Sequence, residues 1–204
     1  MNKAAQPTGG SGFLHNPYVE EIIKLAVPLL VITLIVAGCL GAVNAITADR
    51  IAQIEVEKTQ AAMGAVIEGA SFTPVDFTDE TGMITGVYTA TINGEYAGMC
   101  LQVSPNGFSA AIGMIVGISP ENEVLGVEIV SSSETSGLGS RASEDEWRAQ
   151  FVGKTGPLTV QKNAATGEND IVAITGATIT SQAVTDGVQA ALDYAAANQP
   201  GVTE

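Results

Sequence analysis

The chain has 204 residues, and its 8 Lys and Arg residues stand against 22 Asp and Glu residues, for a formal net charge of -14. Such an acidic chain has too few cations to build the basic face with which proteins hold nucleic-acid phosphates. One His and two Cys residues are also too few for a zinc site of the Cys and His type or for a disulfide framework. The length allows one domain, or one domain with an appendage.

An apolar segment dominates the N-terminal part of the chain. Residues 25–48 include no charged side chain, and as a helix they are long enough to cross a hydrocarbon core of roughly 30 Å. A buried helix of a small domain normally carries a polar stripe, which makes that alternative weaker. We therefore predict a transmembrane helix over residues 25–48, after a short N-terminal tail over residues 1–24.

Cys39 gives this segment a second interpretation. Val36-Ala37-Gly38-Cys39 resembles a lipoprotein box, in which cleavage would leave Cys39 as a lipidated N-terminus. The apolar run continues past Cys39 as far as Ile46, which a lipoprotein would not need. A secretory signal also has a shorter apolar region. We favour an uncleaved anchor, and whether Cys39 is lipidated stays open.

The charges on either side of the anchor are nearly balanced. Lys3 and Lys24 precede it, and Arg50 and Lys58 follow it. The positive-inside rule counts such residues near each end of a span, so here it decides little. A short tail before a single span suits a cytoplasmic N-terminus, which would place the rest of the chain outside the cytoplasm.

The chain after the anchor divides into a stalk and a folded domain. Residues 49–80 are predicted to form a helical stalk, over residues 49–68, and then a connector rich in Ser, Thr, Pro and Asp. A domain follows over residues 81–200, in which Asn93-Gly94 is the strongest short hairpin signal. The predicted helices cover residues 143–151 and 181–197, and the predicted strands cover residues 84–92, 95–103, 109–118, 124–130, 158–162 and 170–175. This order predicts an α+β fold, an antiparallel sheet with flanking helices on a single N-terminal transmembrane helix.

Catalytic chemistry has few candidate residues in the domain. The one His, His15, precedes the anchor, so the domain has no His to act as a general base or in a triad. Cys100 lies within a predicted strand, where a buried structural Cys is the better interpretation. The many carboxylates are expected to form a solvated surface, and no pair of them resembles a catalytic dyad. We expect no catalytic residue and no metal site.

Two glycine-bearing segments differ from the rest of the domain. Residues 134–141, ETSGLGSR, contain G-x-G without the third Gly of a dinucleotide fingerprint, so a tight loop is the simplest interpretation. Residues 175–181, TGATITS, lie between a strand and the last helix, where Thr180 or Ser181 is expected to be the N-cap. The unpaired N–H groups and the dipole of a helix start favour an anion. A phosphate at Thr178 could therefore be held without a basic cluster, which would suit a phosphorylated cofactor.

These two segments resemble the two signatures of the FMN-binding domain family. Residues 175–178, TGAT, followed by ITS, resemble its flavinylation motif, and residues 134–139, ETSGLG, resemble its second signature. One N-terminal span before such a domain resembles the G subunit of the Rnf ion-translocating electron-transport complex. It is also similar to the C subunit of the sodium-pumping NADH:quinone reductase, but the shorter chain favours the Rnf family.

The resemblance implies a cofactor and its mode of attachment. FMN would be bound covalently, through a phosphoester between its phosphate and Thr178 that a flavin transferase forms. The isoalloxazine ring would then stay free for redox chemistry. The residues that the resemblance places in the attachment turn, along the flavin or close to it are Thr175, Gly176, Ala177, Glu134, Thr135, Leu138, Gly139, Lys162, Thr180 and Ser181.

The chain departs from the family pattern at two positions. The family commonly has Asp three residues before the first Thr of the motif, where this chain has Val172, with Asp170 two residues earlier on the same face of the strand. This departure concerns recognition by the transferase. The second signature commonly has Pro where this chain has Ser136, which should loosen the turn without removing any chemistry.

Together with the anchor, the resemblance implies a single-pass protein of the cell membrane with an extracytoplasmic electron-carrier domain. It would relay electrons within an Rnf-type complex between ferredoxin and NAD, coupled to sodium or proton translocation, without being a catalyst by itself. Its partners would be the other subunits, a flavin transferase during maturation and the lipid bilayer. A membrane-anchored lipoprotein or binding domain without a cofactor is the alternative from another class.

Overall fold

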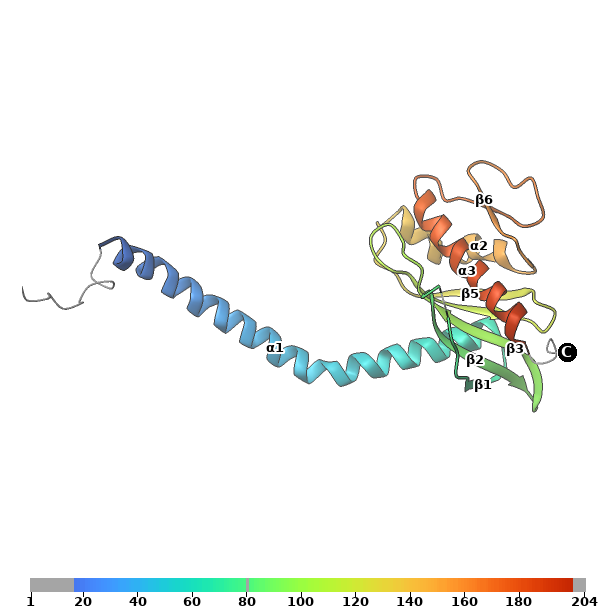
Figure 1. Cartoon of the computed structure of the whole chain (residues 1–204), viewed down its shortest axis with the longest axis horizontal. Coiled ribbons are helices and arrows are strands. Elements are labelled where there is room, and N and C mark those ends of the chain that lie inside the picture. The colour runs from blue at the N-terminus through green and yellow to red at the C-terminus, as the bar shows by residue number, and fades with distance from the viewer. Residues whose placement is uncertain (1–16, 80, 200–204) are drawn as a thin grey trace, which may run out of the picture. The chain divides into compact units, whose positions relative to one another are not determined.

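The computed structural model describes residues 17–79 and 81–199. The chain divides into two compact units, one up to Ile54 and one from Glu55 onward. Helix α1 (Pro17–Val66) contributes to both units (Figure 1).

The first unit consists, in its described part, of the apolar portion of α1. All residues from 21 to 54 are exposed. Within the described chain, α1 alone is long and apolar enough to cross a membrane, with a mean hydropathy of 2.5. The helix begins at Pro17, so the last residues of the predicted tail are helical and Pro28 lies inside the helix. Residues 1–16, with the rest of that tail and His15, lie outside the described residues.

The second unit is built on a five-stranded antiparallel sheet. Its strands lie side by side in chain order, so each is hydrogen-bonded to the strand that precedes it in the sequence. This meander confirms the predicted α+β fold class. The strands are β1 (Ser71–Pro74), β2 (Ile84–Ile92), β3 (Glu95–Val103), β4 (Gly113–Ile118) and β5 (Val124–Ser131).

The β2–β3 hairpin has the bounds that the sequence predicts. Asn93 and Gly94 both have positive φ, at 55° and 86°, as a two-residue turn of type I′ requires. Ile92 and Glu95 are the pair that closes the turn. The Asn-Gly dipeptide therefore also sets the register of the two central strands.

Strands β1 and β4 depart from the sequence prediction. Strand β1 lies within the predicted connector, where its residues pair with β2. Strand β4 begins later than predicted because the residues before it form a turn, in which the Gly107 N–H donates to the Ala110 carbonyl at 2.9 Å. The Ile112 N–H donates to the Pro105 carbonyl at 2.8 Å and closes the base of this turn.

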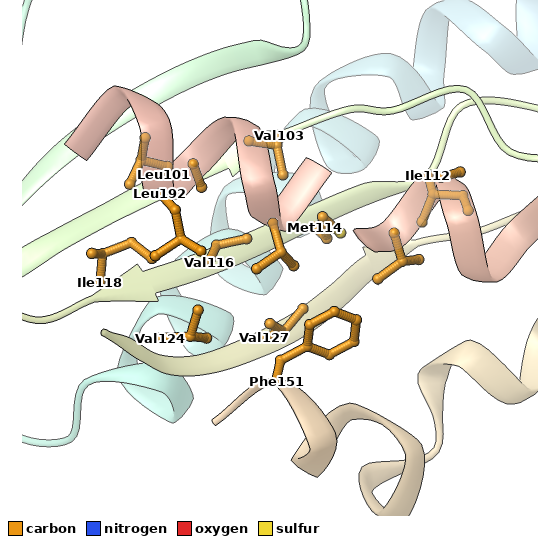
Figure 2. Close-up of a cluster of buried hydrophobic side chains, with 14 of the residues drawn as sticks. Leu101, Val103, Ile112, Met114, Val116, Ile118, Val124, Val127, Phe151 and Leu192 are labelled. Carbon is orange, nitrogen blue, oxygen red and sulfur yellow. The ribbon is translucent and has the colours of Figure 1, made fainter. Parts of the chain in front are cut away.

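Helix α3 (Thr178–Asn198) covers one face of the sheet. Its buried apolar residues, including Val184, Val188 and Leu192, pack in one cluster with β3 and β4. Figure 2 shows Leu192 from the helix beside side chains of β3, β4 and β5 in this core. The labelled side chains there are Leu101, Val103, Ile112, Met114, Val116, Ile118, Val124, Val127, Phe151 and Leu192.

The last turns of α1 cover the opposite face. Met63 and Val66 form a second buried cluster with Cys100 and Ile115. A Cβ atom at Gly117 would lie 3.2 Å from the Val66 side chain, so this strand glycine lets the helix approach the sheet closely. The end of the predicted stalk is therefore not a free helix, because its last turns are part of the folded core.

Short elements connect the sheet to α3. They are η1 (Gly139–Ser143), α2 (Asp145–Arg148), η2 (Ala149–Phe151), β6 (Thr159–Gln161) and β7 (Asp170–Val172). Strands β6 and β7 pair in parallel, in a second small sheet that the sequence did not indicate. Trp147 of α2 donates its indole N–H to the Val172 carbonyl at 2.8 Å, which fixes β7 just before the turn into α3.

Candidate functional site

The start of α3 differs from the sequence expectation. Thr178 is its first residue and Ala177 its N-cap, and no side chain caps the helix. Neither Thr180 nor Ser181 is the N-cap, because both already lie inside the helix. The first-turn N–H groups therefore have no side-chain acceptor at a helix end that favours an anion. Thr178 itself is exposed.

Ser181 is buried behind this turn. Its hydroxyl accepts a hydrogen bond from the Ile174 N–H at 2.9 Å and donates one to the Ala177 carbonyl at 3.0 Å. It thereby joins the end of the β7 segment to the first turn of α3. Gly176 lies between them with φ of 80°, a left-handed conformation that favours glycine.

Glu134, at the beginning of the loop after β5, contacts two other segments. Its Oε1 accepts a hydrogen bond from the Ser109 N–H at 2.9 Å, and its Oε2 accepts one from the Thr180 hydroxyl at 2.5 Å. Partial burial by itself raises the pKa of Glu134. The hydrogen bonds from Thr180 and from the backbone of the 108–110 turn outweigh burial and lower the pKa below its ordinary value. Glu134 is therefore ionised at neutral pH.

Two glycines leave room for this carboxylate. A Cβ atom at Gly139 would lie 2.7 Å from Glu134 Oε2 and from Thr180 Oγ1. A Cβ atom at Gly107 would lie 2.6 Å from Glu134 Oε1. Any side chain at either position would push the carboxylate away from its partners. Gly139, the second glycine of the G-x-G in the loop after β5, therefore has a packing role beside the Glu134 carboxylate.

A cavity of about 360 Å³ opens where these three segments meet. Such a volume is in the range of small-molecule and cofactor sites, which span about 300–1,000 Å³. The 107–110 turn, the loop after β5 and the start of α3 each contribute to its wall. The residues that line it are Phe108, Glu134, Thr135, Leu138, Gly139, Gly176, Ala177, Thr178, Ile179 and Thr180.

The structure brings together most of the residues that the sequence singled out. Those lining the cavity include the candidates from both glycine-bearing segments, although the segments are about 40 residues apart in sequence. Three candidates do not line it. Ser181 lies behind the turn, Thr175 lines a neighbouring depression with Trp147 and Val172, and Lys162 is exposed just after the end of β6.

Sequence reasoning missed two residues of the cavity wall. Phe108 and Ile179 are both exposed, at 66% and 57%. Ile179 lies inside the recognised motif between two Thr residues, so its apolar side chain at an exposed helix start was an available signal. Phe108 follows Asn106-Gly107, a turn signal that the prediction of a strand from residue 109 overlooked.

Asp170 does not take the place of the Asp that the family commonly has where this chain has Val172. Asp170 Oδ2 accepts hydrogen bonds from the N–H groups of Thr166 and Gly167, at 2.9 and 2.8 Å, and from the Thr166 hydroxyl at 2.9 Å. These bonds lower the pKa of Asp170 to about 2. Its carboxylate therefore closes the 166–167 turn and does not substitute for a carboxylate at position 172.

Other reactive groups are absent from the described part of the cavity wall. Cys100 is fully buried in β3, and burial raises the pKa of its thiol to about 12, which fits a structural role. Over residues 17–79 and 81–199, no group of His, Cys, Asp and Glu side chains is placed to hold a metal ion.

Comparison with known proteins identifies the family. Residues 107–193 match the FMN-binding domain family, a span that includes all three segments of the cavity wall. The chain is 35% identical to the G subunit of the Na(+)-translocating ferredoxin:NAD(+) oxidoreductase complex of Acetobacterium woodii, over 83% of this chain and 89% of that protein. The chain belongs to the Rnf G-subunit family.

Further relatives in the Rnf G-subunit family carry related names. The G subunit of the proton-translocating ferredoxin:NAD(+) oxidoreductase complex of Clostridium ljungdahlii is 34% identical, over 80% of this chain and 86% of that protein. The G subunit of the ion-translocating oxidoreductase complex of Methanosarcina acetivorans is 30% identical, over 88% of this chain and 97% of that protein.

A solved structure of another protein is also similar to this chain. The C subunit of Na(+)-translocating NADH-quinone reductase from Parabacteroides distasonis, known from a crystal structure, is 19% identical. The match covers 56% of this chain and 64% of that one, with a TM-score of 0.46.

The cavity wall of this Rnf G-subunit family member fits FMN in its chemistry. Phe108, Leu138 and Ile179 provide apolar surface for a flat ring system. Thr178 provides an exposed hydroxyl at a helix start whose N–H groups favour a phosphate. No basic cluster is needed, which agrees with the acidic composition of the chain.

Proposed function

We propose that this chain is a membrane-anchored flavoprotein that carries electrons within an Rnf-type complex. The complex would couple electron transfer between ferredoxin and NAD to the translocation of sodium ions or protons. FMN would be attached covalently to Thr178 through its phosphate. The observation that carries this proposal is the position of Thr178, the exposed first residue of α3, on the wall of the cavity within the matched FMN-binding domain.

The attachment is a phosphoryl-group transfer to a hydroxyl. The Thr178 hydroxyl would lose its proton and gain a bond to the phosphorus of the FMN moiety. A flavin dinucleotide is a suitable donor, because its pyrophosphate bond breaks and a nucleoside monophosphate leaves. A flavin transferase would supply the catalytic groups, since the described part of the cavity wall contains no His, Lys or metal site.

The chain itself would bind and orient the cofactor. The first-turn N–H groups of α3 would hold the phosphate oxygens, and Leu138 would cover an apolar part of the ring. Attached FMN supplies reversible redox chemistry through its isoalloxazine ring, which stays chemically unmodified. Covalent attachment would also prevent loss of the cofactor outside the cytoplasm, where no free pool would replace it.

The first prediction tests the attachment. Thr178→Val keeps the shape of the side chain and removes its hydroxyl, so the purified full-length chain should lose covalent flavin and stay folded. Intact-mass spectrometry should find wild type heavier than the unmodified chain by FMN less one water, and the Thr178→Val variant without that increment. Thr73→Val, which removes an exposed threonine hydroxyl on β1 that does not line the cavity, is the matched control and should keep covalent flavin. A Thr178→Val chain that still carries flavin after denaturation would contradict the assignment.

The same spectra distinguish the alternative from another class. A lipoprotein or binding domain without cofactor would show no flavin mass in the wild-type chain. If it were cleaved at the lipoprotein box, it would begin at a diacylated Cys39. We expect instead an intact anchor with Cys39 unmodified.

A further inference from the structure

Exposed apolar side chains gather around the cavity. Phe108, Leu138 and Ile179 are 66%, 43% and 57% exposed, and they come from three separate segments of the chain. Single exposed apolar residues are normal on a protein surface, whereas a convergent group of them marks a binding site. Phe108 is the only aromatic side chain among the described residues of this wall.

The turn that carries Phe108 is well defined by its backbone. Asn106 and Ala111 form a β-bridge, the Gly107 N–H bonds the Ala110 carbonyl, and the Ile112 N–H bonds the Pro105 carbonyl. These contacts set the backbone on both sides of Phe108.

Glu134 joins this turn to the start of α3. One carboxylate oxygen accepts from the Ser109 N–H, next to Phe108, and the other accepts from the Thr180 hydroxyl, two residues after Thr178. Gly107 allows the close approach, because a Cβ atom there would lie 2.6 Å from Glu134 Oε1. The carboxylate therefore ties the backbone next to Phe108 to the start of α3, which carries Thr178.

We propose that Phe108 forms the aromatic wall of the FMN pocket and that Glu134 is the positioning residue that holds the Phe108 turn against the start of α3. The inference rests on the proposed function, which supplies the cofactor. A planar aromatic side chain can stack on a flat ring system or meet its edge, which the aliphatic Leu138 and Ile179 cannot do. Phe108 thus contacts the ring directly, whereas Glu134 acts through the turn.

A tryptophan at position 108 tests the contact. An indole in van der Waals contact with an isoalloxazine ring quenches its emission by electron transfer, and this effect falls steeply with distance. In the full-length flavinylated chain, Phe108→Trp should lower the emission per bound flavin several-fold and shorten its lifetime. Phe77→Trp is the matched control, since Phe77 is also exposed but does not line the cavity, and its emission should stay at the wild-type level.

Two changes at Glu134 test the positioning role. Glu134→Ala removes both acceptors, and in the Phe108→Trp background it should restore much of the emission by releasing the turn. Glu134→Gln keeps an acceptor for Ser109 and places a donor opposite the Thr180 hydroxyl, which can accept, so the quenching should persist. If quenching persists with Glu134→Gln and is lost with Glu134→Ala, the hydrogen bonds between the segments hold the turn, and the negative charge does not.

The outcomes distinguish the two proposals. A wild-type chain without flavin would overturn the proposed function. A chain with normal flavin content, but with equal emission in the Phe108→Trp and Phe77→Trp variants, would overturn the aromatic wall and leave the proposed function intact. Phe108→Tyr, a smaller change that also introduces an electron donor, gives the same test if the Trp variant does not fold. Quenching that is unaffected by Glu134→Ala would overturn the positioning role alone.

Discussion

Glu134 places a negative charge at the cavity wall, because its hydrogen bonds lower the pKa of the carboxyl group. Reduction of a flavin adds negative charge, which a nearby carboxylate disfavours. In the flavinylated chain we expect Glu134→Gln to raise the midpoint potential of FMN while attachment stays intact. A shift of about 30 mV corresponds to about 1.4 kcal/mol for a two-electron couple, the order expected of one charge at a partly exposed site.

Spectroelectrochemical titration measures this shift. Glu144→Gln is a suitable control, because it removes a carboxylate that pairs with Arg141 on the surface and does not line the cavity. An unchanged potential in the Glu134→Gln variant, with flavin fully bound, would mean that Glu134 has only its structural role and that other groups tune the potential.

At the scale of elements, one buried hydroxyl, that of Ser181, links the segment after β7 to the first turn of α3. Ser181→Ala leaves the Ile174 N–H without its acceptor in a buried position, and such a loss costs about 1–3 kcal/mol. We expect the free energy of unfolding to fall by this amount in urea denaturation, with covalent flavin retained because Ser181 does not line the cavity. Gln182→Ala, on the exposed side of the same helix, should change stability far less. If Ser181→Ala instead removed the flavin from a fully stable chain, a direct role at the cofactor would replace the structural one.

The sequence predicts elements best where the signal is local. Asn93-Gly94 predicts the central hairpin because its two positive φ angles suit few other residues, and the TGAT motif locates the turn before α3. Sequence prediction fails where contacts with distant segments of the chain decide whether an element forms. Strand β1 is only four residues long and becomes a strand through pairing with β2. The end of the stalk helix is buried because Gly117 admits Val66.

The candidate site could be predicted only in part for the same reason. Its two motif segments have recognisable sequences. The third segment has a turn signal in Asn106-Gly107, but its place at the cavity follows only from its contact with Glu134. Phe108 and Ile179 lack titratable groups, so a search for chemistry in the sequence passes over them. The N-cap of α3 also differs from the sequence expectation, because Ser181 and Thr180 use their hydroxyls in longer-range contacts.

At the scale of the whole chain, the side of the membrane on which the second unit lies can be determined by labelling. The near balance of charges around α1 does not decide the orientation. The chain is suited to labelling of an introduced cysteine, because its own two cysteines are expected to be unreactive. Cys100 is buried with a thiol pKa of about 12, and Cys39 lies within the apolar helix, so neither should react with a membrane-impermeant maleimide. Glu121→Cys, at an exposed position in the β4–β5 loop, would then be the single reactive thiol among the described residues.

We expect Glu121→Cys to be labelled in intact cells, because the domain is proposed to lie outside the cytoplasm. The unsubstituted chain measures background, and permeabilised cells give the total reactive amount. In cells with an outer membrane, the reagent must be one that its pores admit. Equal labelling before and after permeabilisation would support an extracytoplasmic domain. Labelling only after permeabilisation would place the domain in the cytoplasm, and protection against loss of FMN would then no longer explain the covalent bond to Thr178.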